Sequence, residues 1–207
     1  MEPDVGDGSG LNALASLRRF VRPRAVRERC ELCGVELADD HPHLVELANR
    51  KLRCACLACS LLFAEQTAPR FRRVPRRVQF LADFRLDDAQ WESLNLPINL
   101  AFFLHHSASG RVVALYPSPA VVTESLLALE AWEALVEENP VLRQLEPDVE
   151  ALLANRVGTA REHYRVGIDE CYKLAGLVRT HWRGLSGGTE VWDEIGRFFA
   201  HLKARSS

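Results

Sequence analysis

The chain has 207 residues and a formal net charge of −2, with 47% hydrophobic and 26% charged residues. This composition is that of a folded globular protein and excludes wholesale disorder. The chain has no apolar run near the roughly 18 residues that a membrane-spanning helix needs. Its start lacks the basic-then-apolar pattern of a signal peptide. We therefore expect a cytoplasmic protein, in which clustered cysteines would bind a metal rather than form disulfides.

The first 27 residues are predicted to lie outside the main folded parts. Residues 1–10 are rich in turn-forming residues and predict a mobile tail. In residues 11–21, Leu14, Leu17 and Val21 recur at helical spacing. We therefore expect a short amphipathic helix that ends before Pro23.

Five of the six cysteines lie within residues 30–59. Cys30 and Cys33 form one Cys-x2-Cys pair, and Cys56 and Cys59 form a second. This spacing is typical of a metal site, because two thiolates in one tight turn reach the same ion and a second pair completes a tetrahedron around Zn²⁺. Gly34 suits the first turn, which needs a residue that tolerates positive φ. The sequence therefore predicts a four-cysteine zinc site.

The ligand set has alternatives. Cys54 is surplus to the two pairs and is an alternative ligand. His41 and His43 are further candidates, placed behind the cysteines because a histidine in a Pro-flanked turn is more often a surface residue. An iron–sulfur cluster also takes four thiolates. We favour zinc, because structural zinc sites commonly consist of two separate Cys-x2-Cys pairs.

Residues 28–68 are predicted to form the metal-binding module. Residues 43–47 and 51–54 predict two short strands, and residues 57–65 predict a helix. A cysteine turn, a hairpin and a second cysteine pair that enters a helix follow the order of a treble-clef or zinc-ribbon-like module. A module this small would obtain its folding free energy from the metal.

Residues 69–77 are predicted to be a linker rich in arginine and proline, because the two prolines prevent a helix. The arginines and Phe71 are suited to contact nucleic acid through phosphates and stacked bases. The chain as a whole is slightly acidic, however, with a formal net charge of −2. We therefore favour the interpretation that these arginines cover acidic surface of the neighbouring domain.

Residues 78–207 are predicted to form an α+β domain with an antiparallel sheet and packed helices. Alternating and continuous apolar runs predict two hairpins, at 98–116 and at 149–168, with His105 and His106 in the first turn. Helical periodicity predicts four helices, at 87–94, from 118 or 123 to 139, at 169–183 and at 189–202. We expect Asp87, Asp169 and Thr189 to cap three of them, and Trp192 to point inward.

No catalytic constellation is recognised in this domain. His105 and His106 have no carboxylate at informative spacing, and Cys171 lies on the apolar face of a predicted helix. Residues 185–188 lack the Gly-Lys-Ser/Thr ending of a phosphate-binding loop. We therefore expect a binding protein rather than an enzyme.

Six segments are distinctive in combination. They are CELCG at 30–34, HLVEL at 43–47, LRCACLACSLLF at 52–63, YPSP at 116–119, EPDVEALL at 146–153 and HWRGLSGG at 181–188. Together they resemble a bacterial family of uncharacterised function whose genes tend to lie in uptake NiFe-hydrogenase clusters. The resemblance covers about residues 28–203. It implies a role in assembling, metallating or supporting a hydrogenase, with a hydrogenase subunit or maturation factor as the protein partner.

The sequence thus predicts a zinc-binding accessory protein that acts through protein–protein interaction. One alternative is an iron–sulfur electron-transfer protein of a hydrogenase complex, and a second is a nucleic-acid-binding zinc-finger protein.

Overall fold

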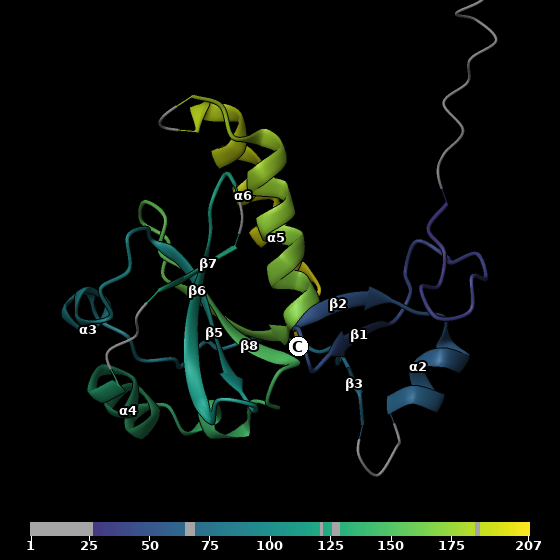
Figure 1. Ribbon diagram of the computed structural model, residues 1–207. Helices are drawn as coiled ribbons and strands as arrows, with labels where there is room; N and C mark the ends of the chain where they lie inside the picture. Colours follow the sequence, from purple (N-terminus) through teal and green to yellow (C-terminus); the bar gives the residue numbers. More distant parts are fainter. Residues whose placement is uncertain (1–26, 65–68, 121, 126–128, 185–186) are drawn as a thin grey trace, which may run out of the picture.

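The computed structural model describes residues 27–64, 69–120, 122–125, 129–184 and 187–207. The tail and helix expected in residues 1–21 lie outside these ranges. The described residues form two antiparallel sheets, one of three strands in the order β2-β1-β3 and one of six strands in the order β4-β9-β8-β5-β6-β7 (Figure 1). The protein is therefore α+β, with the small sheet beside the large one.

The small sheet belongs to the N-terminal module. Its elements are β1 (His43–Glu46), β2 (Lys51–Cys54), α2 (Leu57–Ala64) and β3 (Phe71–Arg73). Strands β1 and β2 form the predicted hairpin, with His43 opposite Cys54. Strand β3 lies inside the predicted linker, since it pairs with the other edge of β1 and buries Phe71. The two prolines of residues 69–77 flank this edge strand rather than interrupt it, which is where a sheet tolerates proline.

The large sheet contains both predicted hairpins. Its strands are β4 (Val78–Phe80), β5 (Leu100–His106), β6 (Arg111–Pro117), β7 (Val122–Ser125), β8 (Glu150–Asn155) and β9 (Glu162–Gly167). His105 and His106 are part of β5 rather than of the turn after it. The helix expected to begin at residue 118 or 123 is replaced there by β7, which pairs with β6. The β-branched Val122 and Thr123 favour this extended edge strand.

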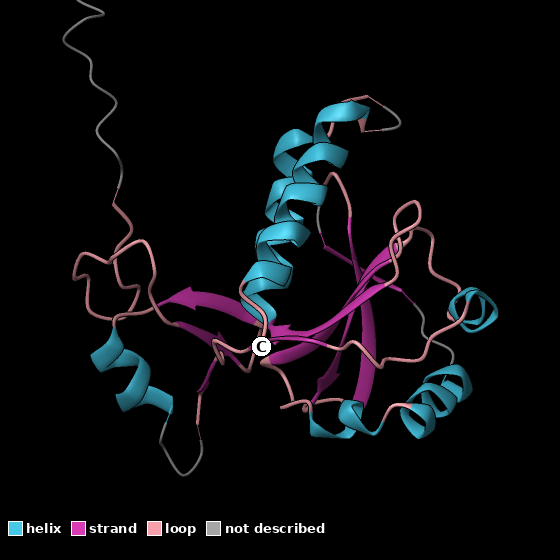
Figure 2. Ribbon diagram, turned by 180° about the vertical axis from the view of Figure 1, so that it is seen from behind, coloured by secondary structure: helices cyan, strands magenta, loops and turns pink. Residues whose placement is uncertain are grey.

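Helices cover both faces of the large sheet (Figure 2). They are α3 (Asp88–Ser93), α4 (Leu129–Glu138), the 3-10 helix η1 (Pro140–Gln144), α5 (Ile168–His181) and α6 (Gly188–Ala204). On β5, Phe102 packs in the cluster that includes α5 and α6, whereas Phe103 packs in the cluster that includes α3 and α4. Alternate residues of a strand point to opposite faces, so β5 is buried on both sides.

The predicted helix caps are only partly right. Asp87 caps α3 through a complete capping box with Gln90. Asp169 is not the cap of α5, which follows Gly167, and α6 begins at Gly188 rather than after Thr189. The inward residue at the start of α6 is Val191, while Trp192 is 41% exposed. None of the helices that the structure describes is long and apolar enough to cross a membrane.

The module is joined to the main domain by packing as well as by the chain. Val45 of β1 and Val74, which follows β3, pack in the same apolar cluster as α5 and α6. His43 accepts a backbone hydrogen bond from Val74 of 3.0 Å, and its Nδ1 lies 3.0 Å from Asp169 Oδ2 at the start of α5. The junction therefore lies beside the cysteine-bearing end of the β1–β2 hairpin.

Candidate metal centre

The first cysteine pair lies in a tight turn before β1. The Gly34 amide donates to the Cys30 carbonyl at 2.8 Å, and the Cys30 amide donates to the Val35 carbonyl at 2.8 Å. Gly34 has a φ of +78°, a left-handed conformation that glycine adopts without a Cβ penalty. The turn therefore has the form that the Cys-Glu-Leu-Cys-Gly segment predicts.

The second pair lies where β2 leads into α2. Cys56 precedes the helix, and Cys59 lies in its first turn. The Cys59 amide points at the Cys56 sulfur at 3.4 Å. Free amides at the start of a helix favour a thiolate there. The Glu31 amide donates to the Cys54 carbonyl at 2.9 Å, which holds the first cysteine turn against the end of β2.

These elements bring Cys30, Cys33, Cys56 and Cys59 together, with their Sγ atoms all within 4.8 Å of one another. The Cys33 and Cys56 sulfurs are 3.8 Å apart. Two thiolates that share one tetrahedral zinc, each about 2.3 Å from the ion, stand about 3.8 Å apart. The four thiols can therefore hold a metal ion with little rearrangement.

The surroundings shift the pKa values of these thiols in opposite directions. Burial by itself raises the pKa of Cys30, but backbone amides of Cys56, Leu32 and Cys33 outweigh it and lower that pKa to about 6. Burial, together with the neighbouring sulfurs, raises the pKa of Cys59 to about 12. A bound cation would favour all four thiolates, so metal binding would release protons.

Cys54 belongs to a different group, which it forms with His41 and His43. One ligand atom from each of these three residues lies within 4.8 Å of the others. Residue spacing alone did not assign Cys54. The available signal was the predicted hairpin, although its register comes from the structure, in which β1 (His43–Glu46) pairs with β2 (Lys51–Cys54) and places His43 opposite Cys54.

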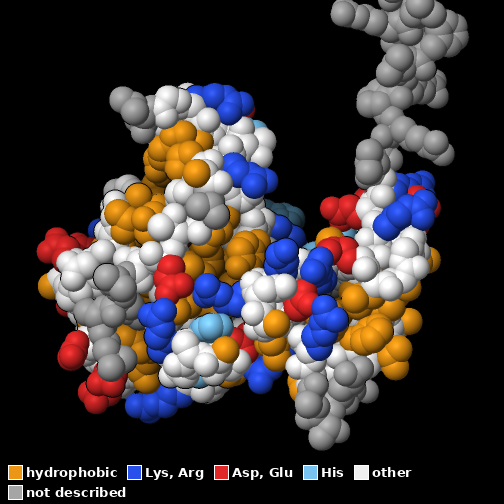
Figure 3. Space-filling view, viewed as in Figure 1, with side chains coloured by type: hydrophobic (Ala, Val, Ile, Leu, Met, Phe, Trp, Pro, Cys, Tyr) orange, Lys and Arg blue, Asp and Glu red, His pale blue; other side chains and the backbone are white. Residues whose placement is uncertain are grey.

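The arginines of residues 69–77 face carboxylates on both sides of the junction. Their ion pairs are Arg70–Glu46, Arg72–Asp148 at 3.5 Å, Arg76–Asp40 at 3.1 Å and Arg77–Glu150 at 3.2 Å. Figure 3 shows positive and negative side chains side by side in this region. Phe71 is only 5% exposed and is not available to stack on a base. The arrangement supports the interpretation that these arginines cover acidic surface.

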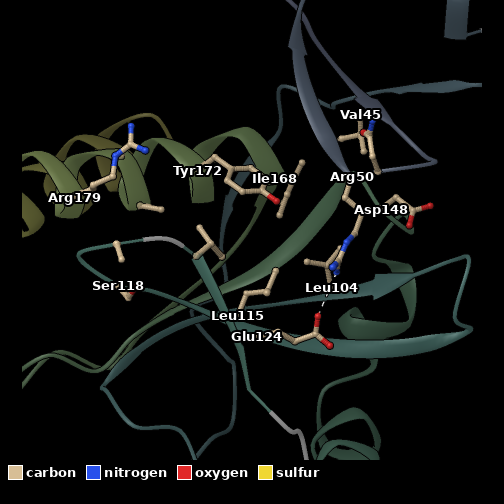
Figure 4. A pocket seen from close by; sticks show the side chains of 15 residues that line it. Val45, Arg50, Leu104, Leu115, Ser118, Glu124, Asp148, Ile168, Tyr172 and Arg179 are labelled. Atoms are coloured by element: carbon tan, nitrogen blue, oxygen red, sulfur yellow. Dashed lines mark hydrogen bonds and ion pairs between the residues drawn. The ribbon is translucent and has the colours of Figure 1, made fainter.

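A cleft lies between the module and the main domain. It has a volume of about 500 Å³ and is bounded by β1, β6, β7 and α5. Arg50 of the hairpin turn reaches Glu124 of β7 at 3.5 Å, while Arg179 of α5 lies at the far end (Figure 4). Leu104, Leu115 and other apolar residues line the part between them. The cleft joins an apolar surface to charged ends, and one guanidinium is already paired.

The remaining sequence candidates do not form a site in the described part of the chain. Cys171 is fully buried in the core, where desolvation raises its pKa. His163 is buried against the Phe84 ring, and this burial lowers its pKa to about 4. His105, His106 and His181 are in neither group of potential metal ligands.

The fold and the site define an α+β protein with an N-terminal zinc-ribbon-like module and a four-cysteine cluster that can hold a metal ion. Residues 29–206 match the family of unknown function DUF5947, and the chain belongs to this family. No curated protein matches the chain, and neither does any solved structure.

Proposed function

We propose that this protein is a zinc-binding accessory protein, whose module presents a metal-stabilised surface to a protein partner. The observation that carries the proposal is the convergence of Cys30, Cys33, Cys56 and Cys59 within 4.8 Å. Four thiolates with no open position are typical of structural rather than catalytic zinc. The ion would fix the first cysteine turn to the start of α2.

Helix α2 offers the surface for such a partner. Four of the five large hydrophobic residues that are exposed among the described residues lie in the module: Val35, Leu57, Leu61 and Leu62, at 50%, 58%, 40% and 67% exposure. The sequence of α2, Leu57–Ala64, contains no charged residue. We call Leu57, Leu61 and Leu62 the leucine surface, which Figure 3 shows as hydrophobic side chains around α2. Apolar surface of this kind marks a site of protein contact.

The proposed partner is a NiFe-hydrogenase subunit or maturation factor. The support for it is the resemblance of the cysteine segments and the His-Trp-Arg-Gly-Leu-Ser-Gly-Gly segment to a family encoded near uptake hydrogenase genes. A partner that docks on the leucine surface must itself present an apolar patch, because α2 offers no side-chain charge.

The test is co-purification of the tagged full chain with NiFe-hydrogenase subunits and maturation factors in cells that produce them. Leu62→Asp should abolish capture, since a carboxylate would be buried without a partner in the interface. The matched control is Ala200→Asp, which places the same charge at an exposed position of α6. Equal capture of these proteins by both variants, or no capture by the wild-type chain, would contradict the proposal.

A further inference from the structure

A second group of potential ligands lies beside the four-cysteine cluster. It consists of His41 in the loop before β1, His43 at the start of β1 and Cys54 at the end of β2. One ligand atom from each lies within 4.8 Å of the others. The two imidazole rings are 4.8 Å apart between centroids. The β1–β2 register brings His43 beside Cys54, because it pairs these two residues.

Hydrogen bonds orient both imidazole rings in the same way. His41 Nδ1 lies 2.8 Å from the Ala38 carbonyl oxygen, which can only accept, so Nδ1 carries the proton. His43 Nδ1 lies 3.0 Å from Asp169 Oδ2, and a carboxylate is ionised at neutral pH. Each neutral ring therefore presents the lone pair of Nε2. A ring that donates Nδ1–H to a carbonyl or carboxylate is typical of a metal-binding histidine.

The surroundings of His41 Nε2 favour a bound cation. The His41 side chain is only 6% exposed, and its Nε2 atom is buried without a hydrogen-bond partner. Glu28 Oε2 lies 3.4 Å away, outside hydrogen-bond geometry. In the neutral ring, the Nε2 lone pair that faces this carboxylate is repulsive, and a buried polar atom without a partner is costly. A metal ion between the two groups removes both costs.

We propose that His41, His43 and Cys54 bind a second divalent transition-metal ion, with Glu28, which lies beside His41 and outside this group, as the fourth ligand once its exposed side chain turns toward the ion. One thiolate, two imidazoles and a carboxylate suit Zn²⁺ in tetrahedral geometry. Asp169 is a positioning residue, because it holds the His43 ring without contacting the ion. It also belongs to α5, so the second site ties the module to the main domain. The proposal explains why a fifth cysteine is present and is independent of the protein partner.

The test counts metal ions on the full chain after loading with Zn²⁺ under reducing conditions and removal of free metal. The wild-type chain should retain about two zinc ions, and Cys54→Ala should retain about one. Asp169→Asn keeps every ligand and should lower the affinity for one of the two ions by about 10–100-fold. This second variant keeps the proposal testable if Cys54→Ala fails to fold.

His181→Gln is the matched control, because His181 also pairs its Nδ1 with a carboxylate, Glu190, at 2.8 Å but is in neither ligand group. It should leave both ions in place. A wild-type chain that retains only one zinc ion would overturn the proposal and make Cys54 at most a substitute ligand of the first site. Two zinc ions retained with unchanged affinity in both Cys54→Ala and Asp169→Asn would overturn it as well.

Discussion

The buried ion pair between Glu150 and Arg165 gives the sharpest prediction about stability. Glu150 is 0% exposed, and its Oε2 accepts from Arg165 Nε at 2.9 Å and from the Glu146 amide at 3.0 Å. Its Oε1 accepts from Arg77 at 3.2 Å. Arg165 is 6% exposed, so Glu150→Leu would leave a buried guanidinium without a counter-charge. We expect a loss of about 3–5 kcal/mol in the free energy of unfolding.

The assay is urea unfolding of the full chain, followed by tryptophan fluorescence, to which the buried Trp91 and Trp132 contribute. A loss of this size is a large part of the roughly 5–15 kcal/mol that stabilises a typical domain. The double variant Glu150→Leu/Arg165→Met should recover most of it, because no unpaired buried charge is left. Arg197→Ala, which breaks an exposed i,i+3 pair on α6, should cost less than about 1 kcal/mol. A loss below about 1 kcal/mol for Glu150→Leu would refute the reasoning.

Two further predictions concern the module. Arg53, Arg70 and Asn49 donate to Glu46 and lower its pKa from 4.5 to about 2. Because the folded pKa lies below the unfolded one, this stabilisation is complete above about pH 4.5 and is lost as the pH falls toward about 2. Between about pH 6 and about pH 3, the free energy of unfolding in urea should therefore fall less for Glu46→Gln than for the wild type. An identical fall in both proteins would contradict the lowered pKa of Glu46. Cys30→Ser should make residues 27–64 sensitive to limited proteolysis while β5, β8 and β9 stay protected, since the metal supplies the folding free energy of the module; a protease-resistant module would argue against this dependence.

The cysteine module could be predicted because its constraints are local. Cys-x2-Cys spacing with Gly34 defines the first turn, and the apolar run after Cys56 defines α2. The two hairpins of the main domain could be predicted as well, since their strands are continuous or alternating apolar runs separated by short turns.

The features that sequence reasoning missed depend on contacts between distant residues. Strand β3 exists because an unpaired edge of β1 is available, although its own residues look like a linker. Strand β7 likewise forms on the edge of β6, where local periodicity indicated a helix.

The role of His43 also depends on a distant contact. Its orientation comes from Asp169, which is 126 residues away in the chain. The carboxylate partner of Arg72 is Asp148, in the loop before β8. The partner of Arg77 is Glu150, on β8 itself and 73 residues further along the chain. Local patterns carry no information about such pairs.

The central claim is that the four-cysteine cluster holds zinc. The most direct measurement is the metal content of the full chain purified without oxygen, together with a visible spectrum of the same sample. We expect about one or two zinc ions per chain and no visible absorption, because Zn²⁺ has a filled d shell, is not redox-active and absorbs no visible light. Iron with acid-labile sulfide and a coloured spectrum would contradict it and would assign the cluster to electron transfer.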